Sequence, residues 1–427
     1  MGLSSVGTYV TLIALPFHLS ERGPVAVSAA MMAMLVPQAL GAPLAGWLTD
    51  RFPNRRLMVH AQLVAAAALV LATVVLHSMP LLLAALFALG AAAAVTGPAM
   101  SALLPRMTGE ELATRGYAAL ATARSIGTLA GLAIGGVLAE GPGVRTALAV
   151  DAATFVLLAA ALATVRTERD PRLDEAGETT RESAWEGLRR LREDRVLATS
   201  MGGLAVAVLL AVLVNVAEVY FVTRVLGGGG VTFGLIMAAW AGGMVIGAKL
   251  SARLTTDRRL LLGLFGCGAG LGLMLLAPAV APVVAVMVIA WLIGGACNMA
   301  QNVAIQGLVR SRVPDELRGR AFAGMNAVVV TANVLGTFVA GPVTAELGAR
   351  AVFVTAGVGV LVASLGGLAL VTPYLRPVET ETAFGPGARA VRQAETASGS
   401  VVRTPDAAAP ILPKAPRPPR ERRARTA

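Results

Sequence analysis

Long apolar segments alternate with short polar ones along most of this chain. Each apolar segment is long enough to cross a lipid bilayer, which takes about 20 helical residues. Backbone N–H and C=O groups find no water in hydrocarbon, so such segments must be helical. The pattern therefore predicts an all-α polytopic membrane protein with twelve transmembrane helices. We place them at roughly 2–20, 26–49, 57–77, 80–103, 118–139, 145–165, 197–222, 231–253, 259–277, 280–306, 321–343 and 350–372.

The composition agrees with a membrane protein and excludes a set of soluble domains. Of the 427 residues, 56% are hydrophobic and 14% are charged, and the mean hydropathy is +0.71. The sequence has no Gly-Lys-Ser/Thr phosphate loop, and His18, His60 and His77 lack a metal-ligand spacing. Cys267 and Cys297 lie inside apolar segments, where they fit core packing. We therefore predict no enzyme activity, no cofactor and no metal site.

Basic residues are concentrated in alternate loops, which orients the predicted helices. Cytoplasmic loops of membrane proteins carry an excess of Lys and Arg. The loops after the even-numbered segments are rich in arginine, whereas the other loops carry only Arg22, Arg145, Arg224 and Arg350. Both termini are therefore predicted to be cytoplasmic. The net charge of +11 is an orientation signal and does not indicate nucleic-acid binding.

A charged linker at residues 166–196 divides the segments six and six. This predicts bundles at 1–165 and 197–373, followed by a disordered basic tail at 374–427. In the linker, Trp185, Leu188, Leu191 and Val196 fit either a helix on the inner membrane surface or a solvated loop. The first segment has no basic residues before it. Either the true start lies upstream, which we favour, or the first helix is short at its inner end.

The two bundles share sequence elements. Glu110-Glu-Leu-Ala-Thr-Arg115 follows the fourth segment, and Asp315-Glu-Leu-Arg-Gly-Arg320 follows the tenth in the same pattern. More weakly, Gly247 and Ser251 keep the spacing of Gly46 and Asp50. Two like-oriented six-helix halves around an axis along the membrane normal are typical of transporters that rock around a central site.

A charged loop joins the second and third segments and reads Gly46-Trp-Leu-Thr-Asp50-Arg51-Phe-Pro-Asn-Arg55-Arg56. It resembles the signature G-x-L-x-D-R-x-x-R-R of the major facilitator superfamily at the same place, with one extra residue before the arginine pair. Three further stretches, at 98–106, 151–155 and 185–190, are similar to the branch that contains the enterobactin exporter and macrolide-type efflux proteins. The resemblance covers roughly residues 4–373.

The resemblance implies a monomeric carrier in the plasma membrane of a bacterium, which exports a small amphipathic compound in exchange for protons. A drug, a siderophore or a secondary metabolite would fit. The expected partners are thus a small-molecule substrate, protons and the lipid bilayer. Two alternatives stay open: an importer or uniporter of a small solute, and a non-transporting sensor or scaffold with the same fold.

For the charged loop, the resemblance implies a latch that holds the two halves in the outward-facing state. The latch residues are Gly46, Asp50, Arg51, Arg55 and Arg56. A carboxylate at a helix end can meet the amino end of a neighbouring helix and an arginine. Orientation alone would explain the arginines but not the aspartate.

Ionisable residues inside membrane segments are rare and are candidates for function. Glu218 in the seventh segment is our first candidate for carrying the coupled proton; the alternative is an acid paired with Arg224 at the outer end. Asp151 in the sixth segment is the second, although a structural role is favoured for it. Arg124 in the fifth segment has no partner that the sequence identifies.

Polar side chains within the segments are candidates for lining a substrate cavity. Asn298, Gln301, Asn302 and Gln306 form a stripe on the tenth segment, which either faces substrate or makes interhelical hydrogen bonds. Tyr9, His18 and Asn215 are further cavity candidates.

Glycines on the fifth segment recur every four residues, at Gly127, Gly131 and Gly135. The resemblance places an antiporter motif here, normally with a Gly-Pro pair, whereas this chain has Gly131-Leu132. Glycines on one helix face also permit close helix packing without any further role. Both interpretations stay open.

Overall fold

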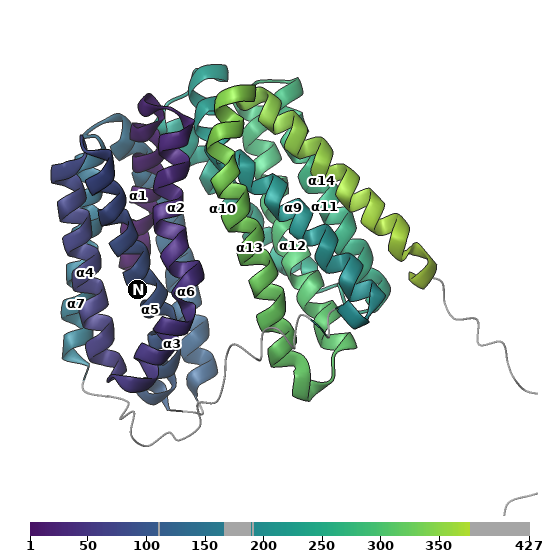
Figure 1. Cartoon of the computed structure of the whole chain (residues 1–427), viewed down its shortest axis with the longest axis horizontal. Helices are drawn as coiled ribbons and strands as arrows, with labels where there is room; N and C mark the ends of the chain where they lie inside the picture. The colour runs from purple at the N-terminus through teal and green to yellow at the C-terminus, as the bar shows by residue number, and fades with distance from the viewer. Residues whose placement is uncertain (110–111, 166–188, 190–191, 376–427) are drawn as a thin grey trace, which may run out of the picture. The chain divides into compact units, whose positions relative to one another are not determined.

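The computed structural model describes residues 1–109, 112–165, 189 and 192–375 (Figure 1). The helix predicted around Trp185 and nearly all of the predicted tail lie outside these residues. The helices are α1 (Gly2–Leu19), α2 (Pro24–Leu40), α3 (Ala42–Arg51), α4 (Asn54–Val75), α5 (Met79–Thr108), α6 (Ala113–Glu140), α7 (Val144–Thr164), α9 (Arg195–Tyr220), α10 (Gly230–Ser251), α11 (Asp257–Val280), α12 (Val284–Arg312), α13 (Asp315–Leu347) and α14 (Ala349–Val371). Short helical turns lie at η1 (Ser20–Arg22), η4 (Phe221–Val225) and η5 (Thr372–Leu375).

The predicted all-α membrane fold is confirmed. Within the described residues, eleven helices are long and apolar enough to cross a membrane, and α2 with α3 forms a bent twelfth span. The bend of 57° lies at Gly41, whose N–H bonds to the carbonyl of Pro37. Proline lacks an N–H and is tolerated in the first turn of a helix, where Pro43 stands in α3. The sequence thus divides this span into two helices.

Helix packing repeats between α1–α7, the N-terminal half, and α9–α14, the C-terminal half. Helix α1 packs against α6 and α7, as α9 packs against α13 and α14. Helix α4 packs against α5 and α7, as α11 packs against α12 and α14. Between the halves, α2 packs against α13, and α10 packs against α6. Because α10 is the C-terminal counterpart of α2 and α13 is the counterpart of α6, these two contacts are equivalent. A two-fold axis between the halves requires this equivalence.

The contacts between α6 and α10 lie at one end of the helices. We call the end with the loops at 52–53, 252–256 and 313–314 the basic end, and the other the opposite end. At the opposite end, a Cβ on Gly136 would lie 2.7 Å from the carbonyl oxygen of Gly230. The Glu140 carboxylate accepts a hydrogen bond of 3.0 Å from the backbone N–H of Val231. A carboxylate is favourable at this helix N-terminus, so it adds to the contact between the halves.

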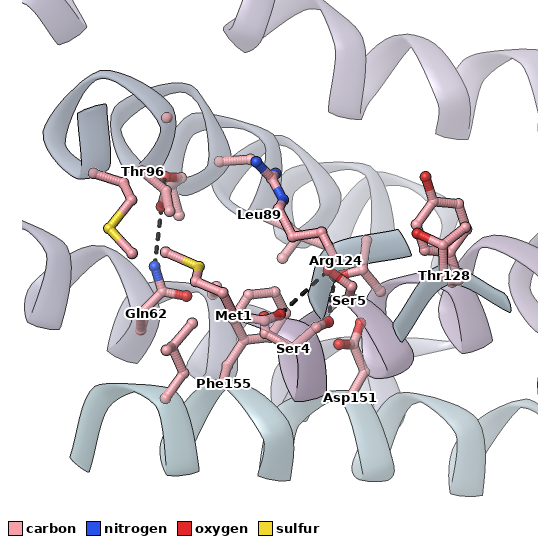
Figure 2. A pocket seen from close by; sticks show the side chains of 18 of the residues that line it. Met1, Ser4, Ser5, Gln62, Leu89, Thr96, Arg124, Thr128, Asp151 and Phe155 are labelled. Carbon is pink, nitrogen blue, oxygen red and sulfur yellow. Dashed lines mark hydrogen bonds between the residues drawn. The ribbon is translucent and has the colours of Figure 1, made fainter. Parts of the chain in front are cut away.

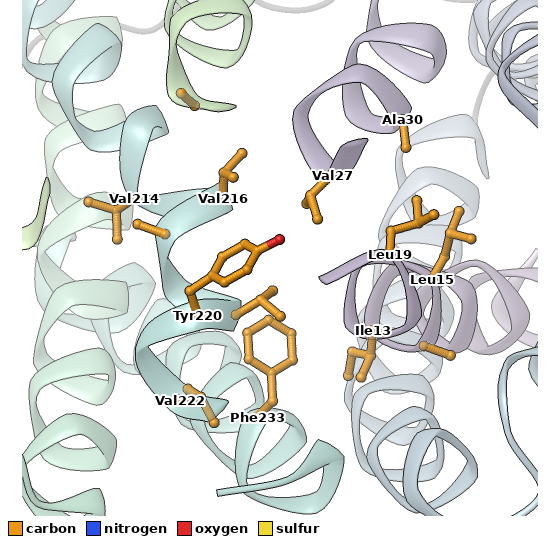
Figure 3. Close-up of a cluster of buried hydrophobic side chains, with 14 of the residues drawn as sticks. Ile13, Leu15, Leu19, Val27, Ala30, Val214, Val216, Tyr220, Val222 and Phe233 are labelled. Atoms are coloured by element: carbon orange, nitrogen blue, oxygen red, sulfur yellow. The ribbon is translucent and has the colours of Figure 1, made fainter. Parts of the chain in front are cut away.

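The contact between α2 and α13 lies at the same end. A Cβ on Gly341 of α13 would lie 2.9 Å from the Cβ of Ser28 on α2. Nearby, the hydroxyl of Tyr220 donates a hydrogen bond of 3.1 Å to the carbonyl oxygen of Ser20. Figure 3 shows Tyr220 among buried side chains of both halves, including Leu19 and Val27. The opposite end is therefore sealed by small residues, two polar contacts and a shared apolar core.

Crosslinking tests this seal. We expect Ser28→Cys with Gly341→Cys, in a chain with Cys267→Ala and Cys297→Ala, to form a disulfide in membranes after mild oxidation. Bridged cysteines have Cβ atoms about 3.5–4.5 Å apart, so the 2.9 Å here requires α13 and α2 to separate slightly before the bridge can form. The measurement is gel migration after protease cleavage in the loop between the halves.

The matched control replaces Gly341→Cys with Gly336→Cys. A Cβ on Gly336 would face Leu209 and Val212 of α9 instead of α2. Crosslinking of both pairs to the same extent, or of neither, would contradict the packing of α13 on α2.

Candidate functional site

A large pocket with both apolar and polar side chains in its wall lies inside the N-terminal half (Figure 2). It is lined by residues of α1, α2, α4, α5, α6 and α7 and holds about 890 Å³. Ligand pockets in proteins are typically about 300–1,000 Å³. We call it the N-half pocket. Its volume suits a drug-sized molecule.

Gln62 of α4 presents an unused hydrogen-bond acceptor to this pocket. Its side chain is 1% exposed, and its Nε2 donates to Thr96 Oγ1 at 3.0 Å. Its Oε1 is buried and has no hydrogen-bond partner among the described residues. An unsatisfied buried acceptor is unfavourable, so this atom favours a donor from a molecule in the pocket.

Asp151 of α7 lies at the wall of the pocket and is held by hydroxyls. It is 1% exposed, and its Oδ2 accepts a hydrogen bond of 2.7 Å from Thr11 of α1. Its Oδ1 lies 3.4 Å from Thr154 Oγ1, one turn along the same helix. A Cβ on Gly7 would collide with Asp151 and Thr154, so glycine lets α1 approach the acid closely. The arrangement ties α1 to α7.

Arg124 of α6 is the positively charged side chain in the wall. It is exposed to the pocket, and no carboxylate among the described residues pairs with it. Tyr9 of α1 also lines the pocket. His18 does not: it lies at the opposite end, near Glu21, Arg22, His77 and Arg145. The structure thus brings one of the two predicted α1 residues to the pocket.

The polar stripe on α12 divides between two environments. Gln301 is buried, and its Nε2 donates to the carbonyl oxygen of Leu264 on α11 at 3.3 Å. Asn302 is exposed and donates to the Asn298 backbone carbonyl at 2.9 Å. The exposed apolar side chain of Ile293 lies nine residues before Asn302 and hence about 180° around the helix. Asn298 and Asn302 therefore face away from the apolar exposed side, whereas Gln301 makes an interhelical contact.

Glu218 of α9 is buried inside the C-terminal half. Its side chain is 5% exposed, and Trp291 of α12 donates a hydrogen bond to its carboxyl group. The other oxygen, Oε1, has no partner among the described residues. Phe353 stacks between Trp291, at 5.8 Å, and Phe221, at 4.4 Å, measured between ring centroids. The acid is therefore buried next to Trp291, which belongs to an aromatic stack with Phe353 and Phe221.

The backbone next to Glu218 departs from a regular α-helix. Residues 221–225 form a π-helical turn, in which the N–H of Leu226 bonds to the carbonyl of Phe221. Such turns occur frequently at functional sites. Arg224 is exposed and lies over the Tyr220 ring at 5.1 Å from its centroid, away from the buried acid. Asn215 is exposed on the same helix.

The charged loop of the signature lies at the basic end. Asp50 is exposed in the last turn of α3, and the guanidinium of Arg51 lies over Trp47 at 5.5 Å from the ring centroid. Arg55 donates to the carbonyl oxygens of Ala163, at 3.1 Å, and Val165, at 2.9 Å. A cation is favourable at the C-terminus of a helix, here α7. Gly46 and the exposed Arg56 belong to the same region.

The α6 glycines face α1 of their own half. A Cβ on Gly127 would collide with Gly2, one on Gly131 with Val6, and one on Gly135 with Val10. Their spacing therefore brings α6 close to α1. The glycine of α6 that meets the other half is Gly136, next to Gly135 in sequence.

Sequence reasoning missed several residues of these sites. Gln62 and Trp291 were not singled out, although each is a polar-tipped side chain within an apolar segment. Glu140 lies one residue beyond the predicted segment 118–139 and was not singled out either. Their roles depend on neighbours from distant segments, which spacing along one helix does not reveal.

Comparisons with known proteins agree on one family. The sequence model of the Major Facilitator Superfamily matches residues 1–289. The multidrug efflux pump Tap of Mycobacterium tuberculosis (strain ATCC 25618 / H37Rv) is 27% identical over 399 residues, which cover 88% of this chain and 92% of the pump. The uncharacterized MFS-type transporter YfiS of Bacillus subtilis (strain 168) is 24% identical, covering 83% and 87% of the two chains.

Solved structures show the same fold at low sequence identity. The nucleoside transporter NupG superimposes with a TM-score of 0.70 at 12% identity, covering 86% of this chain and 96% of NupG. A bacterial homologue of the human lysosomal transporter Spinster, in an inward-facing and unoccupied conformation, gives 0.64 at 16% identity, covering 88% and 97%. Together with the matching family model, these likenesses show that the chain belongs to the major facilitator superfamily of transporters.

Proposed function

We propose that this transporter exports a small amphipathic compound across a bacterial plasma membrane in exchange for protons, by alternating access. The observation that carries the proposal is the exchanged pair of contacts, α2 with α13 and α6 with α10. Their named contacts lie at the opposite end. Two halves joined in this way can rock about the site between them.

Orientation follows from the positive-inside rule. The basic end carries Arg51, Arg55 and Arg56, and residues of this kind favour the cytoplasm. Both termini are then cytoplasmic, and the seal at the opposite end closes the outer side. In this state the substrate sites are reached from the cytoplasm, where an exporter takes up its cargo.

Export is supported by the likeness to the multidrug efflux pump Tap. Import or uniport is the second candidate. It is favoured by the glycines of α6, which pack on α1 and lack the proline of the antiporter motif. A non-transporting scaffold is disfavoured, because it has no use for a pocket of this volume or for a buried carboxyl.

The experiment that decides between these is dye uptake into everted membrane vesicles. Exporter activity predicts respiration-driven accumulation that a protonophore abolishes. Accumulation that survives the protonophore would exclude proton coupling. If these vesicles accumulate no dye from a broad panel, the result would favour the non-transporting scaffold.

We place proton coupling at Glu218. An acid buried against Trp291 is shielded from water, so its charge responds strongly to substrate and conformation. Asp151 is the second candidate; its hydrogen bonds to Thr11 and Thr154 support a structural role.

Replacing Glu218 tests this assignment. We expect Glu218→Gln, which keeps the shape but carries no proton, to reduce proton-driven transport at least tenfold while downhill substrate efflux continues. Counterflow and pH-jump assays in proteoliposomes measure the two activities. Glu346→Gln, at an exposed acid of α13, is the matched control and should behave as wild type. Equal rates of proton-driven transport in Glu218→Gln and wild type would show that Glu218 is not the proton-coupling residue.

The loop of Gly46, Asp50, Arg51, Arg55 and Arg56 is proposed to latch the halves when the outer side opens. Arg55 already anchors it to the end of α7. We expect Asp50→Asn to insert normally but to transport at least tenfold more slowly, because the outward-facing state loses its charged contact. Vesicle uptake normalised to membrane protein is the measurement, and an unchanged rate would remove the latch role.

A further inference from the structure

Arg124 lies deep within a membrane-spanning helix, where its positive charge needs a group of opposite charge to stabilise it. The spanning part of α6 begins at Arg115, and Arg124 lies nine residues further along. At 1.5 Å per residue this is about 14 Å from the basic end of the span. An ionised side chain at such a depth is unfavourable unless a cavity and a partner stabilise it.

The part of the chain that the structure describes supplies the cavity but no carboxylate partner. Among the described residues no carboxylate pairs with Arg124, although it lines the N-half pocket. The pocket's acid, Asp151, already accepts hydrogen bonds from Thr11 and Thr154. A guanidinium presents a planar fork of N–H donors that matches the oxygens of a carboxylate or a similar oxyanion.

A second, independent group points to the same ligand. The Oε1 of Gln62 is a buried acceptor without a donor, and Gln62 lines the pocket from α4 while Arg124 lines it from α6 (Figure 2). Between them the pocket offers apolar surface from Leu12, Met100, Phe155 and Leu158. Together these groups complement a ligand that has an anionic group, a hydrogen-bond donor and an apolar body.

We propose that the N-half pocket selects organic anions: the substrate's carboxylate or equivalent oxyanion binds Arg124, and an N–H or O–H of the same molecule donates to Gln62. The inference rests on the proposed transport function and narrows its substrate class. Cationic amphipathic compounds are disfavoured, because Arg124 repels them.

The test uses three probes with one fluorophore and one sulfonamide N–H. Dansylglycine is an anion, dansylglycinamide is neutral, and dansylcadaverine is a cation. Binding to the purified full chain in detergent, without any gradient, is measured by dansyl fluorescence. We expect wild type to bind dansylglycine most tightly of the three.

Substitutions locate the contacts. Arg124→Gln should weaken dansylglycine binding about tenfold to a hundredfold, the range for a hydrogen bond to a charged group, and leave dansylglycinamide unchanged. Gln62→Leu should weaken both. Arg145→Gln, at an exposed arginine of the opposite end, is the control with the same charge change and should match wild type. Thermal unfolding of each variant establishes that it is folded.

Several outcomes would overturn the proposal. These are equal affinity of Arg124→Gln and wild type for dansylglycine, preference of wild type for dansylcadaverine, or binding of none of the probes. If Arg124-dependent binding is found but everted vesicles transport nothing, the pocket stands and the transport function fails. If proton-driven dye transport is found without anion selectivity, the transport function stands and the anion-selective pocket fails.

Discussion

The absence of water from the bilayer interior is the constraint on which the whole structure depends. It makes every span helical and favours a partner for each polar side chain within a span, either on its own helix or on a neighbouring one. Thr11 with Asp151, Thr96 with Gln62, and Trp291 with Glu218 are such pairs. Among the atoms that this pairing leaves without a partner in the described residues are the Oε1 atoms of Gln62 and Glu218. In the proposed function, a substrate would complete the first and a proton the second.

The N-terminal and C-terminal halves have diverged in content while keeping the same packing. The N-terminal half holds the wide pocket, with a cation and hydroxyls in its wall. In the C-terminal half, Glu218 is buried next to Trp291, which stacks with Phe353 as Phe353 does with Phe221. One half is thus built to hold a molecule and the other to enclose a charge. The exchange of substrate for protons that we propose would use both, because the seal joins the two halves.

Hydrophobic patterning predicted the fold class and the spans well, because the bilayer leaves little choice of secondary structure. The charged loop at Asp50 pointed to the family, which the family model confirms. The sites were harder to predict, because periodicity gives the face of a helix but not its neighbour. Gln301 and Asn302 are adjacent in the predicted stripe, yet one contacts α11 and the other is exposed. Arg224 was the alternative partner of Glu218, but it lies over Tyr220 because its side chain stays outside the apolar interior.

The glycines at the seal have a consequence for the speed and reversibility of the cycle. A long side chain loses up to about 2 kcal/mol of rotational entropy whenever a contact immobilises it, whereas glycine has no side chain to immobilise. Gly136, Gly230 and Gly341 place backbone directly against the opposing half. Each closure of the opposite end therefore orders few rotatable bonds, apart from those of Glu140 and Tyr220. A seal of this kind can open and close many times, and each closure carries little entropic penalty.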